Sequence, residues 1–461
     1  MAIVIKWQRY LSIQPPLMLL IFALSVTGTI LADITVYRTC TTLLGINQTE
    51  CSILHQNGSS KEALRIDALV QPQVSLMSMS KSLIQSLLPA FLSFFVGPWS
   101  DKYGRKPLLL AGYIGQSITY CLLLLMTIWD INPWYFLIAY VPSACLGGFC
   151  IIILASFCYI SDISVENDRA WHLAYLQISI SFGFMLGIFT GPLVYKQYGY
   201  VSVFSLAAMC VVVAGLYVLL FVPETVQSTS RVMWTTLFDI NHVKDLFSTC
   251  TKKRDGFDRC IVWCCMAYLV LNVLIMEGSI SVAYLFSNAR LGWDVGQFST
   301  YMVANIGLGM IGTLIGVKIF GSLAGFSEIC LAILASVSSL TGALVQAFTW
   351  LSWHMYLAVI ISMFGDISGP ALRAILSKSV PPSDTGKVFS LIVSMETIMP
   401  VGATSLYAMV FSHYLPPIYP SPVWLVSSIL FFIMVILLIC VQIRIIKTNT
   451  SQYRVLLQDS E

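Results

Sequence analysis

Long apolar runs alternate with short polar turns along almost the whole chain. Each run can form a helix that crosses about 30 Å of hydrocarbon, which takes about 20 residues. The pattern predicts an all-α polytopic membrane protein with twelve transmembrane helices, and an even number puts both termini on one side. The predicted spans are 14–36, 74–99, 108–129, 134–160, 170–195, 201–222, 260–286, 295–320, 328–350, 353–377, 388–415 and 421–446.

The polar stretches divide these spans into two groups of six. Residues 226–259 are expected to form a cytosolic central loop between an N-terminal six-helix bundle, 1–225, and a C-terminal six-helix bundle, 260–446. Transporters are often built from two such similar bundles. A long polar outer loop at 37–73 and a cytosolic tail at 447–461 complete the expected organisation.

Composition excludes an ordinary soluble globule. The chain is 57% hydrophobic and only 10% charged, against about 25% charged in soluble domains. If the termini are cytosolic, 19 of the 25 Lys and Arg residues fall at cytosolic ends or loops, as the positive-inside rule requires. The net charge of +3 therefore reports topology and indicates no nucleic-acid partner. The first span, preceded by Lys6 and Arg9, is expected to be an uncleaved signal anchor.

The outer loop carries candidate modification sites. Two glycosylation sequons begin at Asn47 and Asn57, and two sequons in one outer loop favour real modification. Cys40 and Cys51 face an oxidising compartment in this topology. They either pair with each other or stay as separate thiols, because sequence alone does not give the geometry.

The turn between the second and third spans concentrates charge and glycine. Gly97, Asp101, Gly104 and Arg105 fall within it, and so dense a charge stays in water. The turn resembles the signature loop between the second and third helices of the major facilitator superfamily. The resemblance implies a gating hinge, and it implies that Arg105 pairs with an acid at the end of the fourth span, Asp162. The alternative is a solvated helix end.

The fifth span holds Gly183, Gly187 and Gly191 at a period of four. This spacing lines one helix face with bare backbone and predicts close contact with another helix.

Two charges lie toward the outer ends of the first two spans. Asp33 is expected about one turn from the outer end of the first span, as a wetted rim residue. Lys81 is expected about two turns into the second span. It either snorkels outward or faces a cavity, where it is available to an anionic substrate or to Asp33. A charge buried within the membrane costs at least about 2.5 kcal/mol, so each needs water or a partner.

The second half carries the main candidates for substrate and proton binding. Glu277 lies in the outer half of the seventh span, where apolar surroundings can keep a carboxyl group protonated. Asp366 and Arg373 are seven residues apart on the tenth span, which predicts one shared helix face. Arg373 and Glu396, on the eleventh span, fall at similar depth and are predicted to pair, leaving Asp366 as the freer acid. The alternative is a structural Arg373 to Glu396 bridge beside an inert Asp366.

The run 371–378, continued at Gly386-Lys387-Val388-Phe389-Ser390, resembles the proton-coupled folate transporter group, solute carrier family 46. So do Gly97-Pro98-Trp99-Ser100-Asp101, Ala155-Ser156-Phe157 leading to Asp162, and Trp293-Asp294. The resemblance implies proton-driven movement of organic anions, with Arg373 helping to bind substrate or couple protons. The chain departs from the folate-carrying member where that member has an aspartate, a glutamate, a histidine and a cysteine; here the residues are Gly148, Gln177, Ile275 and Gly292. These departures indicate another branch of the family.

The tail contains Tyr453-Arg454-Val455-Leu456, which fits a tyrosine-based endocytic or lysosomal sorting signal. Such short patterns are also frequent by chance. Tyr453 and Leu456 are the residues that would be read, and the expected location is the plasma membrane or the lysosomal membrane.

The sequence therefore predicts a secondary active transporter that moves a small organic anion across the bilayer by alternating access, with protons as coupling ion. The alternative from another class is a receptor or accessory protein that keeps the transporter fold. No spacing of histidines suits a metal, and no nucleophile or phosphate-binding motif is present, so neither enzymatic activity nor a cofactor is expected.

Overall fold

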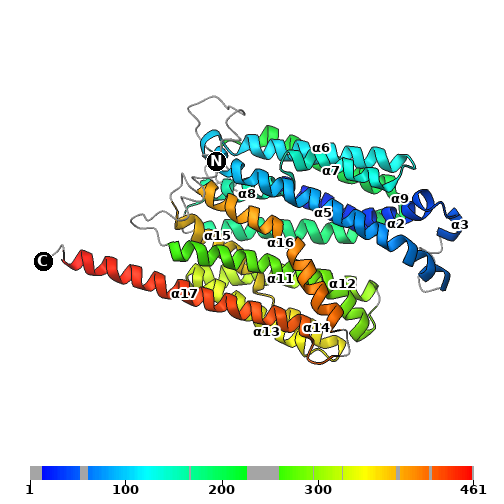
Figure 1. Cartoon of the computed structure of the whole chain (residues 1–461). Helices are drawn as coiled ribbons and strands as arrows, with labels where there is room; N and C mark the ends of the chain where they lie inside the picture. The colour runs from blue at the N-terminus through cyan, green and yellow to red at the C-terminus, as the bar shows by residue number, and fades with distance from the viewer. Residues whose placement is uncertain are drawn as a thin grey trace. The chain divides into compact units, whose positions relative to one another are not determined.

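The computed structural model describes residues 13–51, 61–165, 168–225, 259–293, 295–323, 325–380, 385–414 and 418–458. These residues form helices and turns and contain no β-strand, as expected for an all-α protein (Figure 1). The α-helices are α2 (Gln14–Arg38), α3 (Gln48–Cys51), α5 (Lys61–Tyr103), α6 (Lys106–Ile128), α7 (Phe136–Cys145), α8 (Gly148–Ile163), α9 (Arg169–Phe221), α11 (Arg259–Leu291), α12 (Val295–Ile315), α13 (Glu328–Ala347), α14 (Ser352–Ile361), α15 (Ser368–Lys378), α16 (Thr385–His413) and α17 (Pro422–Gln458).

Eleven helical stretches among the described residues are long and apolar enough to cross a membrane. One of them, α9, has 53 residues, which would reach about 80 Å at 1.5 Å per residue, far more than a bilayer core. Its backbone leaves the helical region at Gly199, with φ 76° and ψ −174°. The break divides α9 into the predicted fifth and sixth spans, so the twelve predicted spans are present.

Two spans expected as single helices are interrupted. In the fourth span α7 ends at Cys145 and α8 begins at Gly148, because Gly147 and Gly148 take left-handed φ values of 83° and 56°. In the tenth span α14 ends at Ile361, and a 3₁₀ turn at Gly365–Ile367 leads into α15. Pro370 near the start of α15 lacks an N–H and would clash with the carbonyl four residues earlier, which stops a continuous helix.

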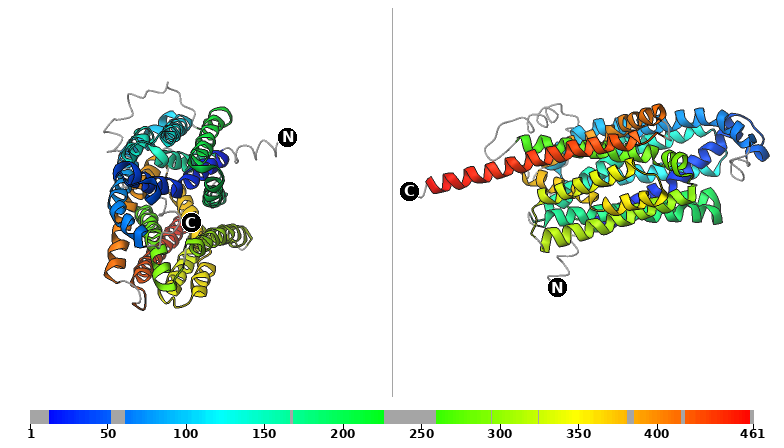
Figure 2. Two further views of the ribbon diagram at one scale, coloured as in Figure 1. Left: turned by 90° about the vertical axis from the view of Figure 1, so that its right-hand side faces the viewer. Right: turned by 90° about the horizontal axis from the view of Figure 1, so that it is seen from below.

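The described chain forms two compact units. The first falls within residues 1–96, 102–156 and 179–233, and the second within 97–101, 157–178 and 234–461. Within the second unit α13 lies beside α17, as both orientations show (Figures 1 and 2), and α11 packs against α16. The sequence-based boundary between bundles at 226–259 lies almost wholly outside the described residues and stays a prediction.

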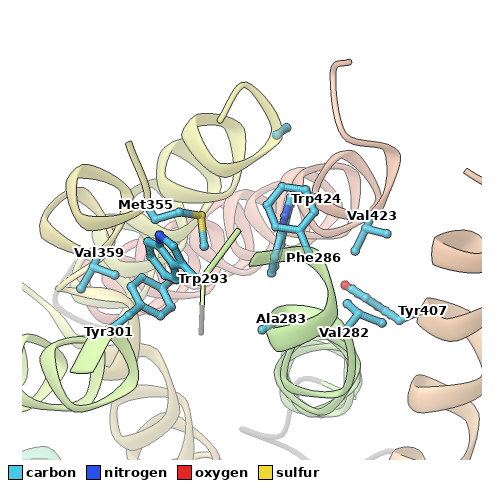
Figure 3. Packing of buried hydrophobic residues seen from close by; sticks show 11 residues of the cluster. Val282, Ala283, Phe286, Trp293, Tyr301, Met355, Val359, Tyr407, Val423 and Trp424 are labelled. Atoms are coloured by element: carbon cyan, nitrogen blue, oxygen red, sulfur yellow. The ribbon is translucent and has the colours of Figure 1, made fainter. Parts of the chain in front are cut away.

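The core of the second unit is aromatic (Figure 3). The rings of Phe286 and Trp424 meet edge to face with centroids 5.5 Å apart. Tyr407 is buried, and its hydroxyl lies 2.7 Å from Ser427 Oγ. Gly278 of α11 lies directly against the Tyr407 ring and has no room for a Cβ. These contacts fix α11 against α16 and α17.

In the first unit α2 and α9 touch through backbone. A Cβ on Gly183 would lie 2.6 Å from the carbonyl oxygen of Met18, and a Cβ on Gly191 would lie 2.8 Å from that of Val26. Gly187, between them, meets the same helix. The glycine period of four read from the sequence is therefore the contact face of α9.

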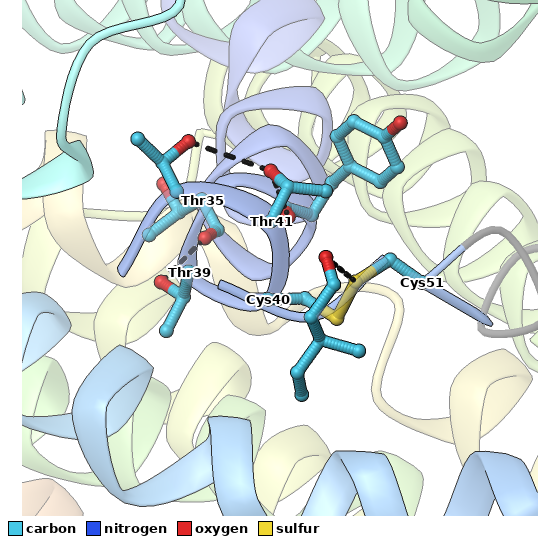
Figure 4. The surroundings of a disulfide bond; sticks show 8 residues. Thr35, Thr39, Cys40, Thr41 and Cys51 are labelled. Atoms are coloured by element: carbon cyan, nitrogen blue, oxygen red, sulfur yellow. Dashed lines mark hydrogen bonds between the residues drawn. A yellow bond between two sulfur atoms is a disulfide. The ribbon is translucent and has the colours of Figure 1, made fainter. Parts of the chain in front are cut away.

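A disulfide joins Cys40 and Cys51, whose Cα atoms lie 6.0 Å apart (Figure 4). Both cysteines are fully buried, and they pack with Ile66, Val70 and Met77 of α5. The expected polar loop at 37–73 is therefore partly helical, since α5 begins at Lys61. We call the disulfide and these α5 residues the cap. Apolar residues near the start of α5, Ile66 and Val70, form the surface on which the disulfide packs.

Candidate functional site

The turn between α5 and α6 is held by an acid from the end of α9. Glu224 accepts the backbone N–H of Arg105 at 2.8 Å and that of Lys106 at 3.0 Å, and so caps α6. Gly104 has a φ of 115°, and a Cβ there would collide with the Glu224 carboxylate. This role of Glu224 was not predicted from the sequence. An acid directly after the last apolar residues of the sixth span was the one feature that could have indicated it.

The start of this turn packs against α16 within the second unit. Asp101 Oδ1 accepts the backbone N–H of Gly386 at 3.1 Å. Gly97 and Gly386 both lack room for a Cβ, the first because of Ser390 and the second because of Asp101. Two glycines and one carboxylate therefore bring α5 and the first turn of α16 into backbone contact.

The expected pairing of Arg105 with Asp162 is not tested by the structure. Arg105 is buried, at 1% exposure, and Asp162 is exposed near the end of α8. The two residues belong to different compact units, and their pairing stays a prediction.

Arg373 and Glu396 come together as an ion pair. Nη2 of Arg373 lies 2.7 Å from Oε1 of Glu396, and the side chains are only 12% and 11% exposed. The guanidinium also lies over the ring of Phe157 of α8, 4.3 Å from the centroid. Phe157, which the sequence analysis noted only as part of a motif, is thus the third member of this group. An ion pair and a cation–π contact together compensate a charge within a membrane span.

Asp366 stands apart from this pair. Asp366 lies on the 3₁₀ turn Gly365–Ile367 directly before α15, and its sharing of a face with Arg373 stays a prediction. Its side chain is exposed and makes no hydrogen bond or ion pair with any residue that the structure describes. Its carboxylate instead approaches α12, where a Cβ on Gly309 would lie 2.5 Å from Oδ2.

Glu277 is half-buried on α11, one residue before the glycine that packs on Tyr407. Within the described ranges it makes no hydrogen bond or ion pair.

A second set of polar contacts lies at the ends of α9, α13 and α15. Lys378 Nζ lies 2.7 Å from Glu328 Oε1, and Arg169 Nη1 donates to Ser377 Oγ at 3.0 Å. Sequence reasoning missed these contacts, because the four residues come from three separate parts of the chain.

In the first unit, the two predicted charges have different surroundings. Asp33 accepts a hydrogen bond from the Tyr200 hydroxyl at 2.6 Å, and Tyr195 donates to Tyr200 at 3.1 Å. Lys81 places its ammonium 5.1 Å from the ring centroid of Tyr140.

The modification and sorting candidates are only partly described. Asn47 is exposed just before α3, where a glycan would find access. Asn57 lies outside the described residues. Tyr453 and Leu456 fall on the last turns of α17. Among the residues that the structure describes, no group of His, Cys, Asp and Glu side chains could hold a metal ion.

Comparison with known sequences finds transporters. A family model described as Major Facilitator Superfamily matches residues 17–404. The chain is 28% identical over 417 residues to the probable peptidoglycan muropeptide transporter SLC46 of Drosophila melanogaster, covering 87% of this chain and 80% of that one. It is 24% identical to the proton-coupled folate transporter of Bos taurus, covering 75% and 74%. It is 25% identical to the lysosomal proton-coupled steroid conjugate and bile acid symporter SLC46A3 of Homo sapiens, covering 98% of each. The resemblance to solute carrier family 46 is confirmed.

Solved structures show the same fold. The human organic anion transporter MFSD10 matches with a TM-score of 0.73 at 14% identity, over 94% of this chain and 99% of that one. The Major Facilitator Superfamily transporter FucP, in the outward conformation, matches with a TM-score of 0.64 at 15% identity, over 94% of this chain and 99% of that one. The predicted fold class is confirmed.

Proposed function

Because the chain belongs to the Major Facilitator Superfamily, we propose that it is a secondary active transporter that carries a small organic anion across a membrane in symport with protons. The observation that carries the proposal is the buried pair of Arg373 and Glu396, together with a second acid of the tenth span, Asp366, that makes no ion pair with any described residue. Relatives named as proton-coupled transporters of folate, or of steroid conjugates and bile acids, support both the coupling ion and the class of cargo.

The Arg373–Glu396 pair can exchange a proton for a substrate. While Glu396 is ionised, its charge balances that of the Arg373 guanidinium. The pair then has no net charge to attract an anion. A proton on Glu396 removes that partner and leaves a cation whose remaining contact among the described side chains is the Phe157 ring. An anionic cargo then restores neutrality, because an uncompensated charge in a membrane span is costly. Proton and anion binding therefore favour each other, as symport requires.

Asp366 supplies a second protonation site. It lies on the 3₁₀ turn before α15, and an exposed carboxylate in mid-span must face water or protein and not lipid. Loss of its charge on protonation would remove the cost of moving it through a closed state. Glu277, whose half-buried side chain makes no ion pair with any described residue, is the third candidate for this role.

Alternating access requires contacts that can break and re-form. The bond from Gly386 to Asp101 and the bond from Arg169 to Ser377 each join segments from the two halves of the sequence. Each contact joins a half-buried side chain, Asp101 or Arg169, to a buried residue, Gly386 or Ser377, and a hydrogen bond to a charged group contributes about 1.5–3 kcal/mol. We propose that they form the cytosolic gate, and that the signature turn with its Glu224 clamp stays folded while the gate opens.

The topology proposed with this function has both termini in the cytosol and the cap outside the cell or inside the lysosome. The membrane is then the plasma membrane or the lysosomal membrane, with Tyr453 and Leu456 as the sorting signal.

The test is uptake by cells that carry Tyr453→Ala with Leu456→Ala, which would retain the protein at the surface. A labelled panel of a folate, a bile acid, a steroid sulfate and a muropeptide is offered at pH 5.5 and pH 7.4. Uptake of at least one anion that rises at acid pH supports the proposal. With surface expression confirmed, the absence of uptake for the whole panel contradicts the proposed cargo class and favours a receptor that keeps the fold.

A further inference from the structure

A pocket of about 70 Å³ opens in the first unit between α2, α5 and the start of α7. Its lining includes Gly28 and Thr35 of α2, Ser78 and Lys81 of α5, and Tyr140 of α7. Met77 lines the pocket as well and also belongs to the cap. The pocket therefore lies at the cap end of the first unit, about two and a half turns from the first residue of the α5 span, Pro72.

Lys81 brings a positive charge to this pocket that no carboxylate balances. The ammonium makes no hydrogen bond or ion pair with any residue that the structure describes, and its contact is the Tyr140 ring. A cation–π contact compensates part of the charge but satisfies none of the three N–H donors. Asp33, the acid nearest in sequence on α2, accepts the Tyr200 hydroxyl and is not part of the lining.

Tyr140 adds a second donor. The residue is only 6% exposed, yet its hydroxyl has no hydrogen-bond partner in the described chain. Lys81 and Tyr140 both line this small pocket, and together they carry an ammonium and a phenol hydroxyl, the donors that suit an oxyanion, which accepts several charge-assisted hydrogen bonds. The Phe136 and Tyr140 rings supply apolar walls for the carbon that bears it.

We infer that this pocket is a recognition site at the cap end for an anionic group of the cargo, a carboxylate or a sulfate, in addition to the anion binding proposed at Arg373, while the rest of the cargo extends beyond the pocket. The volume favours this division, because a space of about 70 Å³ suits an anionic group on a small ring better than a whole multi-ring cargo. The inference rests on the proposed transport of organic anions and names the chemical group by which the cargo is recognised at the cap end.

Gly28 allows the pocket to be closed without removing the charge. A Cβ added there would meet no atom within 4 Å, so a larger side chain extends into the pocket. Leucine also favours a helix more than glycine does, so Gly28→Leu should fold.

The experiment measures binding of benzoate and of uncharged benzamide to the purified full-length protein, by the shift in thermal unfolding. The variants are Lys81→Met, Lys81→Arg and Gly28→Leu, and the control is Lys196→Met, which removes an exposed lysine of the same unit. Benzoate should stabilise the wild type and benzamide should not. Lys81→Met and Gly28→Leu should weaken benzoate binding about tenfold or more, while Lys81→Arg and Lys196→Met keep it. Equal benzoate affinity in Lys81→Met and Lys196→Met, or no benzoate binding by the wild type, overturns the inference.

Uptake separates this inference from the proposed function. For an anion that the wild type transports, Lys81→Met should raise KM about tenfold with little change in maximal rate, since the pocket binds the cargo and takes no part in coupling. If Lys81→Met shows acid-stimulated uptake with an unchanged KM, the inferred anion pocket is wrong and the proposed transport function stands. If benzoate binding depends on Lys81 but the protein takes up no anion, the inferred anion pocket stands and the proposed transport function is wrong.

Discussion

The carboxylate of Glu224 accepts the backbone N–H of Arg105 across 119 residues of chain. Through this bond the end of α9 caps α6 and fixes the turn that carries Gly104 and Arg105. The C-terminal end of the signature turn, at Arg105, is thus held by Glu224 within the first unit. Its N-terminal end, at Asp101, contacts α16 within the second unit.

Glu224→Ala should destabilise the protein by about 1–2 kcal/mol, because two backbone N–H groups at the start of α6 lose their acceptor. The measurement is thermal unfolding of the purified protein. Glu224→Gln, which keeps one acceptor oxygen, should lie between wild type and alanine. An unfolding temperature for Glu224→Ala equal to that of the wild type would contradict the clamp.

Removing one member of the Arg373–Glu396 pair should cost more stability than removing both. A single Arg373→Met or Glu396→Leu strands a buried charge, at a cost of about 3–5 kcal/mol, whereas the double variant leaves none. A double-mutant cycle of unfolding free energies measures this coupling. Additive losses would show that the pair is not coupled in the membrane. All three variants, the two single ones and the double one, should lose acid-stimulated uptake. If the bridge were purely structural, the double variant would instead keep uptake.

Asp366→Asn should reduce the pH dependence of uptake while leaving stability within about 0.5 kcal/mol, since the carboxylate makes no hydrogen bond or ion pair in the described chain. Asparagine resembles the permanently protonated acid, so the ratio of uptake at pH 5.5 to uptake at pH 7.4 should fall, and the remaining pH dependence should come from Glu396. Gly309→Ala is the companion variant, because its methyl group displaces the Asp366 carboxylate. An acid stimulation in Asp366→Asn as large as that of the wild type would assign coupling to Glu396 or Glu277.

Replacing Cys40 and Cys51 together with serine should destabilise the cap, by about 3 kcal/mol for a loop of this size. Hydrogen exchange of the first turns of α5 measures the effect, since Ile66 and Val70 pack on the bond. Cys121→Ser, at an exposed free cysteine, is the control. Unchanged protection of α5 in the double variant would show that the cap holds without its disulfide.

The number of spans could be predicted because the bilayer imposes it: an apolar run of about 20 residues leaves few alternatives. The meeting of Arg373 and Glu396 could be predicted because two charges at similar depth in neighbouring spans each need a partner. The helix break at Asp366 could not, because Gly365, Gly369 and Pro370 permit a break without requiring one. The site that Lys81 forms with Tyr140, like the clamp of Glu224, depends on how distant helices pack, which periodicity does not report.

The glycine contact between α2 and α9 limits how the molecule can move. Where two helices meet through bare backbone, no side chains separate them, and sliding would drive carbonyl oxygens into Cα atoms. The distance between fluorescent labels placed on these two helices should stay constant through the whole transport cycle. The pair is then a fixed reference against which the displacement of every other helix can be measured.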